Sequence, residues 1–322
     1  MADDLITGAT SHVGFAVLVA TLKAGHRVRA SVRHSSVIKS FFANLDFVVV
    51  PDITAFGAFD ACLHRVTYIE HVASPLPRPT EDPENDIIIP AVRGTISILN
   101  SALKVESIRR VVITSSAVAV IPRSALSKGD SENVYTANSR VRPLPSAPWD
   151  DHSSAYRASK VLALDATDRF LAERRPHFSI LNVMPGYVIG ANELVNDPSK
   201  VGSGSNGVVM GVVMGPKTSV ARPCVVVDVQ DVAQIQVAAL DERRVEGSKS
   251  FLLDTDSVHL TMRSTLSKNI SLRRLSIPAV HLRLDVSDSI RTFGPLKNYE
   301  TQVRSVVAHY LALQRKSPGK TK

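Results

Sequence analysis

The first 185 residues alternate short runs of β-branched and other apolar residues with segments long enough to form helices. Directly after the first such run, apolar residues recur with a helical period and stop at Gly25, a residue typical of helix ends. Further candidate strands span residues 27–32, 46–50, 67–72, 109–115 and 178–184. Strands that alternate with helices in this way predict a parallel sheet covered by helices on both faces.

The pattern loosens after Gly190. Residues 207–215 repeat Gly-Val-Val-Met almost twice, and they form either a pliable wall of an apolar substrate pocket or a buried helix packed on a neighbour. Residues 121–152 are polar and predict an excursion, and a final helix is expected around residues 299–313. The last 75 or so residues predict a small C-terminal lobe, and small ligands commonly bind between two lobes.

Composition suits a globular enzyme. The chain has 322 residues, 44% of them hydrophobic, with a mean hydropathy of +0.06. No apolar stretch approaches the roughly 20 residues of a membrane span, so no membrane contact is expected. The formal net charge of +8 is scattered apart from a basic tail at residues 315–322. Without a continuous basic face we expect no nucleic-acid partner, and the excess charge favours anionic ligands.

Cysteine use and the start of the chain predict a cytoplasmic protein. The two cysteines, Cys62 and Cys224, give no disulfide framework and suit a reducing compartment. The first strand begins by Leu5, which leaves no room for a signal or transit peptide. We expect a monomer or a homodimer, and no metal site.

A glycine turn joins the first strand to the first helix. Residues 7–14 read Thr-Gly-Ala-Thr-Ser-His-Val-Gly, which predicts a tight turn into a helix whose free N–H groups and dipole can hold a pyrophosphate. Phe15 stands where a P-loop requires Lys, so the turn is not a P-loop. On these residues alone, a strand–helix turn without a ligand is an equal alternative.

A serine is followed, about 40 residues later, by a Tyr and a Lys four residues apart. Tyr156 and Lys160 lie one turn apart on one helical face, where the cation lowers the Tyr pKa from about 10 toward the range of a general acid or base. Ser116 can hydrogen-bond a substrate carbonyl oxygen. The spacing also occurs by chance, but its order after the glycine turn predicts a site that transfers a proton during hydride transfer.

These motifs resemble the extended short-chain dehydrogenase/reductases, and more closely the dihydroflavonol-reductase-like branch with its fungal aldehyde and ketone reductases. The resemblance runs from about residue 4 to about residue 312. Its further marks are Val32-Arg33, Val50-Pro51-Asp52-Ile53, His71-Val72-Ala73-Ser74-Pro75, Pro90-Ala91-Val92-Arg93-Gly94-Thr95, Pro185-Gly186 and Val227-Asp228-Val229-Gln230-Asp231-Val232-Ala233.

The resemblance implies an α/β fold with a Rossmann-type doubly wound parallel sheet and a smaller C-terminal substrate-binding lobe. The implied NADP-binding domain is residues 1–190, to which residues 220–247 return. The implied lobe is residues 191–219 and 248–322.

The resemblance also implies an NADPH-dependent reductase. Hydride passes from the nicotinamide to the ketone or aldehyde carbonyl of a small, largely apolar substrate, for which a polyketide-like secondary metabolite is one candidate. Tyr156 donates the proton, Lys160 lowers the Tyr pKa and holds the nicotinamide ribose, and Ser116 fixes the carbonyl oxygen. Ser116 is preferred to Ser115 because it ends the Thr-Ser-Ser run and because adjacent strand residues face opposite sides. The implied cofactor-binding residues are Thr7, Gly8, Thr10, Ser11, His12, Val13, Gly14, Arg33, Asp52, Ile53, Val72, Ala73, Ser74, Thr114, Tyr156, Lys160, Pro185, Gly186 and Val188.

Arg33 ends the second strand, where an acid would accept hydrogen bonds from the ribose of NAD. A guanidinium can bind a 2′-phosphate with two hydrogen bonds, and the following His34-Ser35-Ser36 can cap it. NADPH/NADP+ is therefore favoured, the alternative being that Arg33 is only solvated.

Two positions depart from the family. Ser11 stands for the middle glycine of the turn, which we expect to weaken or alter cofactor binding, with strain on the order of 1 kcal/mol if the backbone there needs a positive φ. Ser97 stands where many relatives carry Asn, so a proton relay through that Asn is not assumed.

Two other functions stay open. The first is a sugar-nucleotide epimerase or dehydratase with bound NAD, against which Arg33 and the apolar stretch 207–215 argue. The second is a non-catalytic NADP-sensing regulatory protein, against which the Tyr156–Lys160 pair argues.

Overall fold

The computed structural model describes residues 3–34, 44–214, 222–223, 225–255, 261–262, 275–276 and 279–316. Among the residues singled out above, Ser35, Ser36, Cys224 and the tail beyond residue 316 lie outside these ranges. Cys62 is buried.

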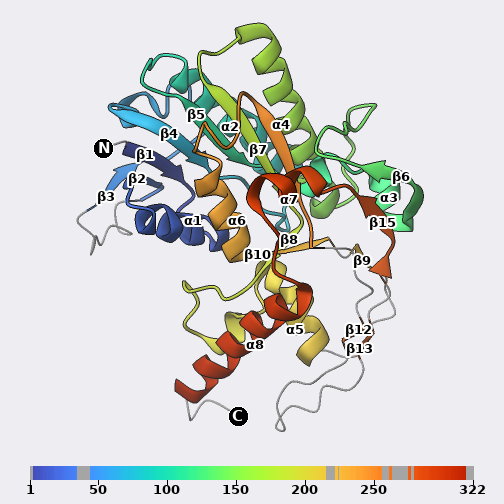
Figure 1. Ribbon diagram of the computed structural model, residues 1–322. Helices are drawn as coiled ribbons and strands as arrows, with labels where there is room; N and C mark the ends of the chain where they lie inside the picture. The colour runs from blue at the N-terminus through green and yellow to red at the C-terminus, as the bar shows by residue number, and fades with distance from the viewer. Residues whose placement is uncertain are drawn as a thin grey trace.

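Seven parallel strands form the central sheet, in the order β11-β7-β5-β4-β1-β2-β3 (Figure 1). They are β1 (Asp3–Thr7), β2 (Arg27–Val32), β3 (Leu45–Val49), β4 (Val66–His71), β5 (Arg110–Thr114), β7 (Ser179–Pro185) and β11 (Lys249–Leu253). The five further strands expected from the sequence are confirmed, with ends displaced by at most one residue. The strand order reverses between β1 and β4, which is the position at which open α/β sheets bind ligands.

Helices cover both faces of the sheet, as the sequence predicts. α1 (His12–Lys23) and α6 (Val229–Ala238) pack together on one face, and α2 (Ile89–Ala102) and α4 (His152–Arg174) pack together on the other. Each pair encloses its own apolar cluster with the sheet, one around Val17 and Val232 and the other around Ile98 and Phe170. Burial on both faces explains why the strand residues form continuous apolar runs.

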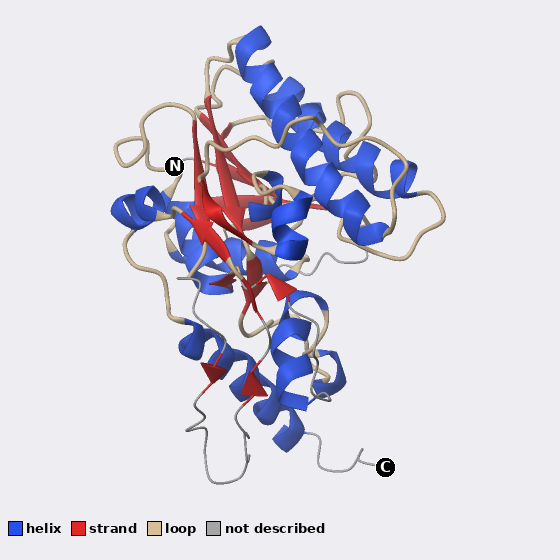
Figure 2. Cartoon of the chain, turned by 90° about the vertical axis from the view of Figure 1, so that its right-hand side faces the viewer, coloured by secondary structure: helices blue, strands red, loops and turns tan. Residues whose placement is uncertain are grey.

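The excursion after β5 and the end of the chain form two smaller groups of elements beside the sheet (Figure 2). α3 (Arg123–Lys128) precedes β6 (Asp130–Tyr135), which pairs with β15 (Leu282–Leu284). Below the sheet, β8 (Tyr187–Ile189) pairs with β10 (Val226–Asp228), and α5 (Gly207–Met214) contacts α8 (Tyr299–Lys316). The remaining elements are η2 (Asp60–Cys62), η3 (Glu84–Ile88), η4 (Ala117–Ala119), η5 (Pro198–Lys200), η6 (Gly204–Asn206), β9 (Arg222–Pro223), β12 (Thr261–Met262), β13 (Leu275–Ser276), β14 (Ala279–Val280) and α7 (Ser287–Phe293).

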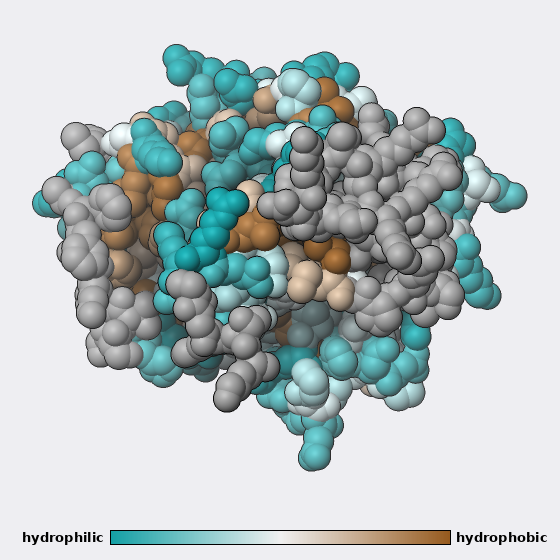
Figure 3. All heavy atoms as spheres, turned by 90° about the horizontal axis from the view of Figure 1, so that it is seen from below, coloured by the Kyte–Doolittle hydropathy of each residue, from teal (hydrophilic) through white to brown (hydrophobic). Residues whose placement is uncertain are grey.

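In α5, part of the repeated apolar segment is a buried helix packed on a neighbour. A role as the wall of a substrate pocket stays a prediction. Val209 and Met210 are buried in a cluster with α8 residues, whereas the side chain of Met214 is 61% exposed. Seen from below, apolar surface lies among polar side chains (Figure 3). Among the described helices, none is both long and apolar enough to cross a membrane.

β11, within the segment that the sequence assigned to the C-terminal lobe, pairs with β7 in the central sheet. The division of the chain into two domains stays a prediction.

Candidate active site

The glycine turn after β1 contains two close backbone approaches. Gly8 has a φ of +72°, and a Cβ there would lie 2.8 Å from the backbone nitrogen of Ala73. A Cβ on Gly14 would lie 2.1 Å from the carbonyl oxygen of Gly8. Both positions therefore require glycine, and the turn lies directly against the segment that follows β4.

Ser11 is the N-cap of α1. Its φ of −96° and ψ of 166° are ordinary extended values, and its Oγ accepts a hydrogen bond from the backbone nitrogen of Gly14 at 3.1 Å. The strain that a positive φ would cause therefore does not arise at Ser11. Serine instead satisfies one of the free N–H groups at the start of the helix.

Ser116, Tyr156 and Lys160 come together at the carboxyl ends of the strands. A capping box between Asp151 and Ser154 fixes the start of α4, and the Tyr and Lys lie in its following turns. The side chain of Ser116, just beyond β5, hydrogen-bonds that of Tyr156. The Lys160 Nζ lies 5.6 Å from the centroid of the Tyr156 ring.

The phenol of Tyr156 is held in its neutral form. Burial raises its pKa to about 12, and the hydrogen bond with Ser116 only partly opposes this. The pKa is thus raised where the sequence led us to expect a fall, because burial dominates. A lowering of this pKa by Lys160 stays a prediction. A phenol that keeps its proton at neutral pH suits a proton donor.

Lys160 is tied to the segment after β4. Its Nζ donates to the Ser74 Oγ at 2.8 Å, and burial lowers its pKa to about 8. The Thr7 Oγ1 accepts from the backbone nitrogen of Ala73 at 3.1 Å and lies 2.9 Å from the His71 Nδ1. Burial and then the charge of Lys160 lower the pKa of His71 to about 3, so this imidazole is neutral. Thr7 and His71 thus fix the segment that positions Ser74.

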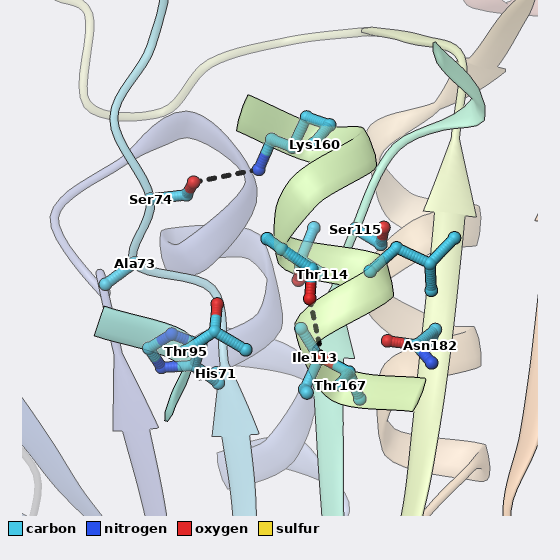
Figure 4. Close-up of a pocket in the computed structure, with 12 residues that line it drawn as sticks. His71, Ala73, Ser74, Thr95, Ile113, Thr114, Ser115, Lys160, Thr167 and Asn182 are labelled. Carbon is cyan, nitrogen blue, oxygen red and sulfur yellow. Dashed lines mark hydrogen bonds between the residues drawn. The ribbon is translucent and has the colours of Figure 1, made fainter. Parts of the chain in front are cut away.

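A small pocket lies beside Lys160, between the ends of β4, β5 and β7 and the helices α2 and α4 (Figure 4). Ser115 lines this pocket, whereas Ser116 bonds Tyr156. Its other polar side chains are His71, Ser74, Thr95, Thr114, Lys160, Thr167 and Asn182. From the sequence alone we predicted no role for His71, Thr95, Thr167 or Asn182. Thr167 had a usable signal, because it lies seven residues after Lys160 and so on the same helical face.

The residues predicted for the adenosine half of a cofactor are more exposed. Arg33 and Asp52 are both exposed. Hydrogen bonds from the side chain and backbone of Thr54 lower the pKa of Asp52. Ile53 lies against α2, where a Cβ on Gly94 would come within 2.9 Å of the Ile53 Cδ1.

Several other residues that were predicted to bind the cofactor are buried or hydrogen-bonded within the protein. Thr114 accepts a hydrogen bond from the Gln236 Nε2 at 2.6 Å, and Val72, Pro185 and Val188 are buried. Ser97 donates to the carbonyl oxygen of Ala55 at 2.9 Å, so it is engaged away from the Tyr–Lys pair. In the described part of the chain, no group of three or more His, Cys, Asp or Glu side chains could hold a metal ion.

Comparison with known proteins extends this picture. The sequence profile of the NAD dependent epimerase/dehydratase family matches residues 5–251. Ketoreductase CTB6 of Cercospora nicotianae is 32% identical, over 99% of this chain and 98% of that protein. The NAD-dependent epimerase/dehydratase FUM13 of Gibberella moniliformis is 39% identical, over 75% of this chain and 72% of that protein.

Solved structures share the fold. A reductase studied for asymmetric catalysis has a TM-score of 0.78 at 25% identity, covering 97% of this chain and 99% of that one. Gre2 of Candida albicans in complex with NADPH has a TM-score of 0.81 at 23% identity, with the same coverage.

These matches confirm the predicted fold and the predicted class of carbonyl oxidoreductase with a nicotinamide cofactor. The chain belongs to the NAD dependent epimerase/dehydratase family.

Proposed function

We propose that this protein is an NADPH-dependent reductase of ketones or aldehydes, with Ser116, Tyr156 and Lys160 as its catalytic residues. The observation that carries the proposal is the contact between the Ser116 and Tyr156 side chains, with the Lys160 ammonium beside the same ring. A hydroxyl to orient a carbonyl, a protonated phenol and a cation are the groups that carbonyl reduction needs.

The residues at the glycine turn fit a nicotinamide cofactor. Gly8 and Gly14 keep side-chain atoms out of the turn, and the first N–H groups of α1 point out of the helix end, where a pyrophosphate is favourably bound. The Nε2 of His12 is also buried, with no hydrogen-bond partner among the described residues. When bound, the cofactor supplies the hydride.

The three catalytic side chains then have separate tasks. Ser116 hydrogen-bonds the substrate carbonyl oxygen, and Tyr156 gives that oxygen its proton. Lys160 is mostly charged at neutral pH, because its pKa is about 8. It stabilises negative charge that develops beside the phenol and holds the nicotinamide ribose, while Ser74 keeps its Nζ in place.

The choice of NADPH over NADH rests on Arg33. This side chain is exposed at the end of β2, next to the exposed His34. A guanidinium there is suited to a 2′-phosphate and poorly suited to the hydrogen bonds that a ribose diol donates. Asp52 and Ile53 are proposed to contact the adenine.

The substrate is proposed to be small and largely apolar. α5 presents apolar side chains, of which Met214 is exposed, and the ketoreductase names of the fungal relatives are consistent with a polyketide-like ketone. We further propose a cytoplasmic location, which the low cysteine content supports.

The experiment is a panel of apolar ketones and aldehydes with NADPH, followed by identification of the product. We expect NADPH oxidation matched by an equal amount of alcohol. Tyr68→Phe is the matched control for Tyr156→Phe. It removes a phenol hydroxyl that donates a hydrogen bond to Glu242, away from the proposed site. NAD retained through denaturing extraction would favour the epimerase instead. No oxidation across the panel, with intact NADPH binding, would favour a cofactor-sensing protein.

A further inference from the structure

The short segment η3 is a π-helical turn that leads directly into α2. Turns of this kind are rare, and they occur frequently at functional sites. Its first residue, Glu84, is exposed, whereas its last two, Ile87 and Ile88, are buried. None of the residues proposed above to act on substrate or cofactor belongs to this turn.

The buried end of η3 lies against the helix that carries the catalytic tyrosine. Its two isoleucines form an apolar cluster with Ala155 and Ala158, which come from the first turns of α4. The side chains of Tyr156 and Trp149 both pack against this cluster. A displacement of η3 would therefore change the surface on which the ring of Tyr156 is packed.

Trp149 connects the excursion after β5 to this turn. Its indole is half-buried, and the Nε1 donates a hydrogen bond to the Glu84 Oε2 at 2.8 Å. Two residues further along the chain, Asp151 begins the capping box that fixes the start of α4. The indole thus bridges the first residue of η3 and the start of the catalytic helix.

The other side-chain contacts of η3 are local. The Asn85 Nδ2 donates to the Asp82 Oδ2 at 2.7 Å, and Asp86 contacts Thr80 and Arg78. All of these partners lie shortly before the turn or within it. Among the described residues, the indole is the one side chain from another part of the chain that hydrogen-bonds η3.

We propose that Trp149 is a positioning residue for carbonyl reduction, which holds Glu84 and so fixes η3 and the apolar cluster against which Tyr156 packs. This inference rests on the proposed function, because Trp149 acts through the proton donor. A tryptophan suits the task, since one hydrogen bond at its edge orients a large packed ring. Positioning matters here because a displacement of about 1 Å can cost about 100-fold in rate.

Steady-state kinetics of Trp149→Phe test this role. Phenylalanine keeps an aromatic ring against the cluster and lacks the donor to Glu84. We expect kcat to fall by about three- to tenfold, with unchanged values of the KM for the ketone and the Kd for NADPH. Tyr68→Phe is again the matched control, because it removes another aromatic donor to a glutamate and should keep wild-type kinetics.

Combination with Tyr156→Phe separates positioning of the proton donor from a general structural defect. Without the phenol hydroxyl there is no proton to position, so adding Trp149→Phe should change the residual kcat by less than about twofold. A general defect would instead lower kcat by the same factor in both backgrounds. Equal factors would overturn the inference.

Variants of Glu84 test the hydrogen bond itself. Glu84→Gln keeps an acceptor oxygen and should keep kcat within about twofold of wild type, whereas Glu84→Leu should match Trp149→Phe. Trp149 is the sole tryptophan of the chain, so the tryptophan fluorescence reports this residue alone. Its quenching by acrylamide should increase in Glu84→Leu and stay unchanged in Glu84→Gln, a comparison that needs no enzyme activity.

The outcomes separate this inference from the proposed function. Wild-type kinetics of Trp149→Phe, or unchanged quenching in Glu84→Leu, would overturn the inference alone. If Trp149→Phe fails to fold, Glu84→Leu, at an exposed position, takes its place in the kinetics and in the combination with Tyr156→Phe. A wild-type protein that binds NADPH but reduces no carbonyl compound would overturn the proposed function, and the inference with it.

Discussion

The two ends of the proposed cofactor site differ in how firmly the fold holds their side chains. At the catalytic end, Ser116 and Lys160 are only 8% and 7% exposed, and each has a defined hydrogen-bond partner. At the adenosine end, Arg33 and Asp52 are exposed. Reactive groups must be positioned before the substrate arrives, whereas an exposed arginine can be ordered by the phosphate that it binds.

This difference predicts different consequences of mutation. Changes at the catalytic end should alter the rate of the chemical step. Changes at the adenosine end should alter the affinity and choice of cofactor and leave the free energy of unfolding nearly unchanged, because surface substitutions usually have small effects on stability.

The largest effect is expected for Tyr156→Phe. The ring still packs against Ala155 and its neighbours, and only the transferable proton is lost. We expect kcat to fall by about 10²- to 10⁴-fold, the usual contribution of a general acid, with an unchanged Kd for NADPH. Steady-state kinetics and NADPH titration measure the two quantities. Activity within a few-fold of wild type would remove Tyr156 from the mechanism.

Arg33→Asp should have the next largest effect, on affinity instead of rate. The ratio of NADH to NADPH dissociation constants should fall by roughly 10- to 100-fold, because a charge-assisted bond to the 2′-phosphate is replaced by repulsion. Arg27→Asp makes the same charge change at the opposite end of β2 and is the matched control. An unchanged ratio would mean that Arg33 stays in solvent.

The pH dependence of kcat/KM tests the catalytic end in the unaltered protein. The value of kcat/KM for NADPH reports groups of the free enzyme. Lys160 carries its charge below its pKa of about 8 and loses it above, so kcat/KM should fall as the pH rises through about 8. Tyr156, with a pKa of about 12, should add no limb in this range. Lys160→Met should remove the limb near 8, and a limb that persists would belong to another group.

Ser11→Gly should have the smallest effect. It removes the Oγ that caps α1 but keeps an acceptable N-cap residue, so we expect the free energy of unfolding to fall by only a few tenths of a kcal/mol. Ser11→Ala has no side-chain oxygen to cap the helix, and alanine is a poor N-cap residue. This variant should lower the free energy of unfolding by about 1 kcal/mol. Chemical denaturation measures the free energy of unfolding of the wild type and of both variants. A variant with Gly that is more stable than wild type would restore the strain argument.

The sequence predicted the sheet, the order of its elements and the convergence of Ser116 with the Tyr–Lys pair. These succeed because they depend on periodicity and on motifs at short range. The raised pKa of Tyr156 and the partners of Ser74 and His71 were not predicted. They depend on how deeply each group is buried and on contacts between distant segments, such as that of Thr7 with His71, which no local pattern specifies.

The most direct test of the account follows the hydride. Wild-type enzyme, an accepted ketone and NADPH that carries deuterium in place of both hydrogens at the reactive nicotinamide carbon are allowed to react to completion, and the alcohol is analysed by mass spectrometry and NMR. We predict one deuterium per molecule, on the carbinol carbon, and an equal amount of NADP+. An alcohol without deuterium, or a product formed with no net consumption of NADPH, would contradict the proposed reduction and favour an epimerase-type cycle.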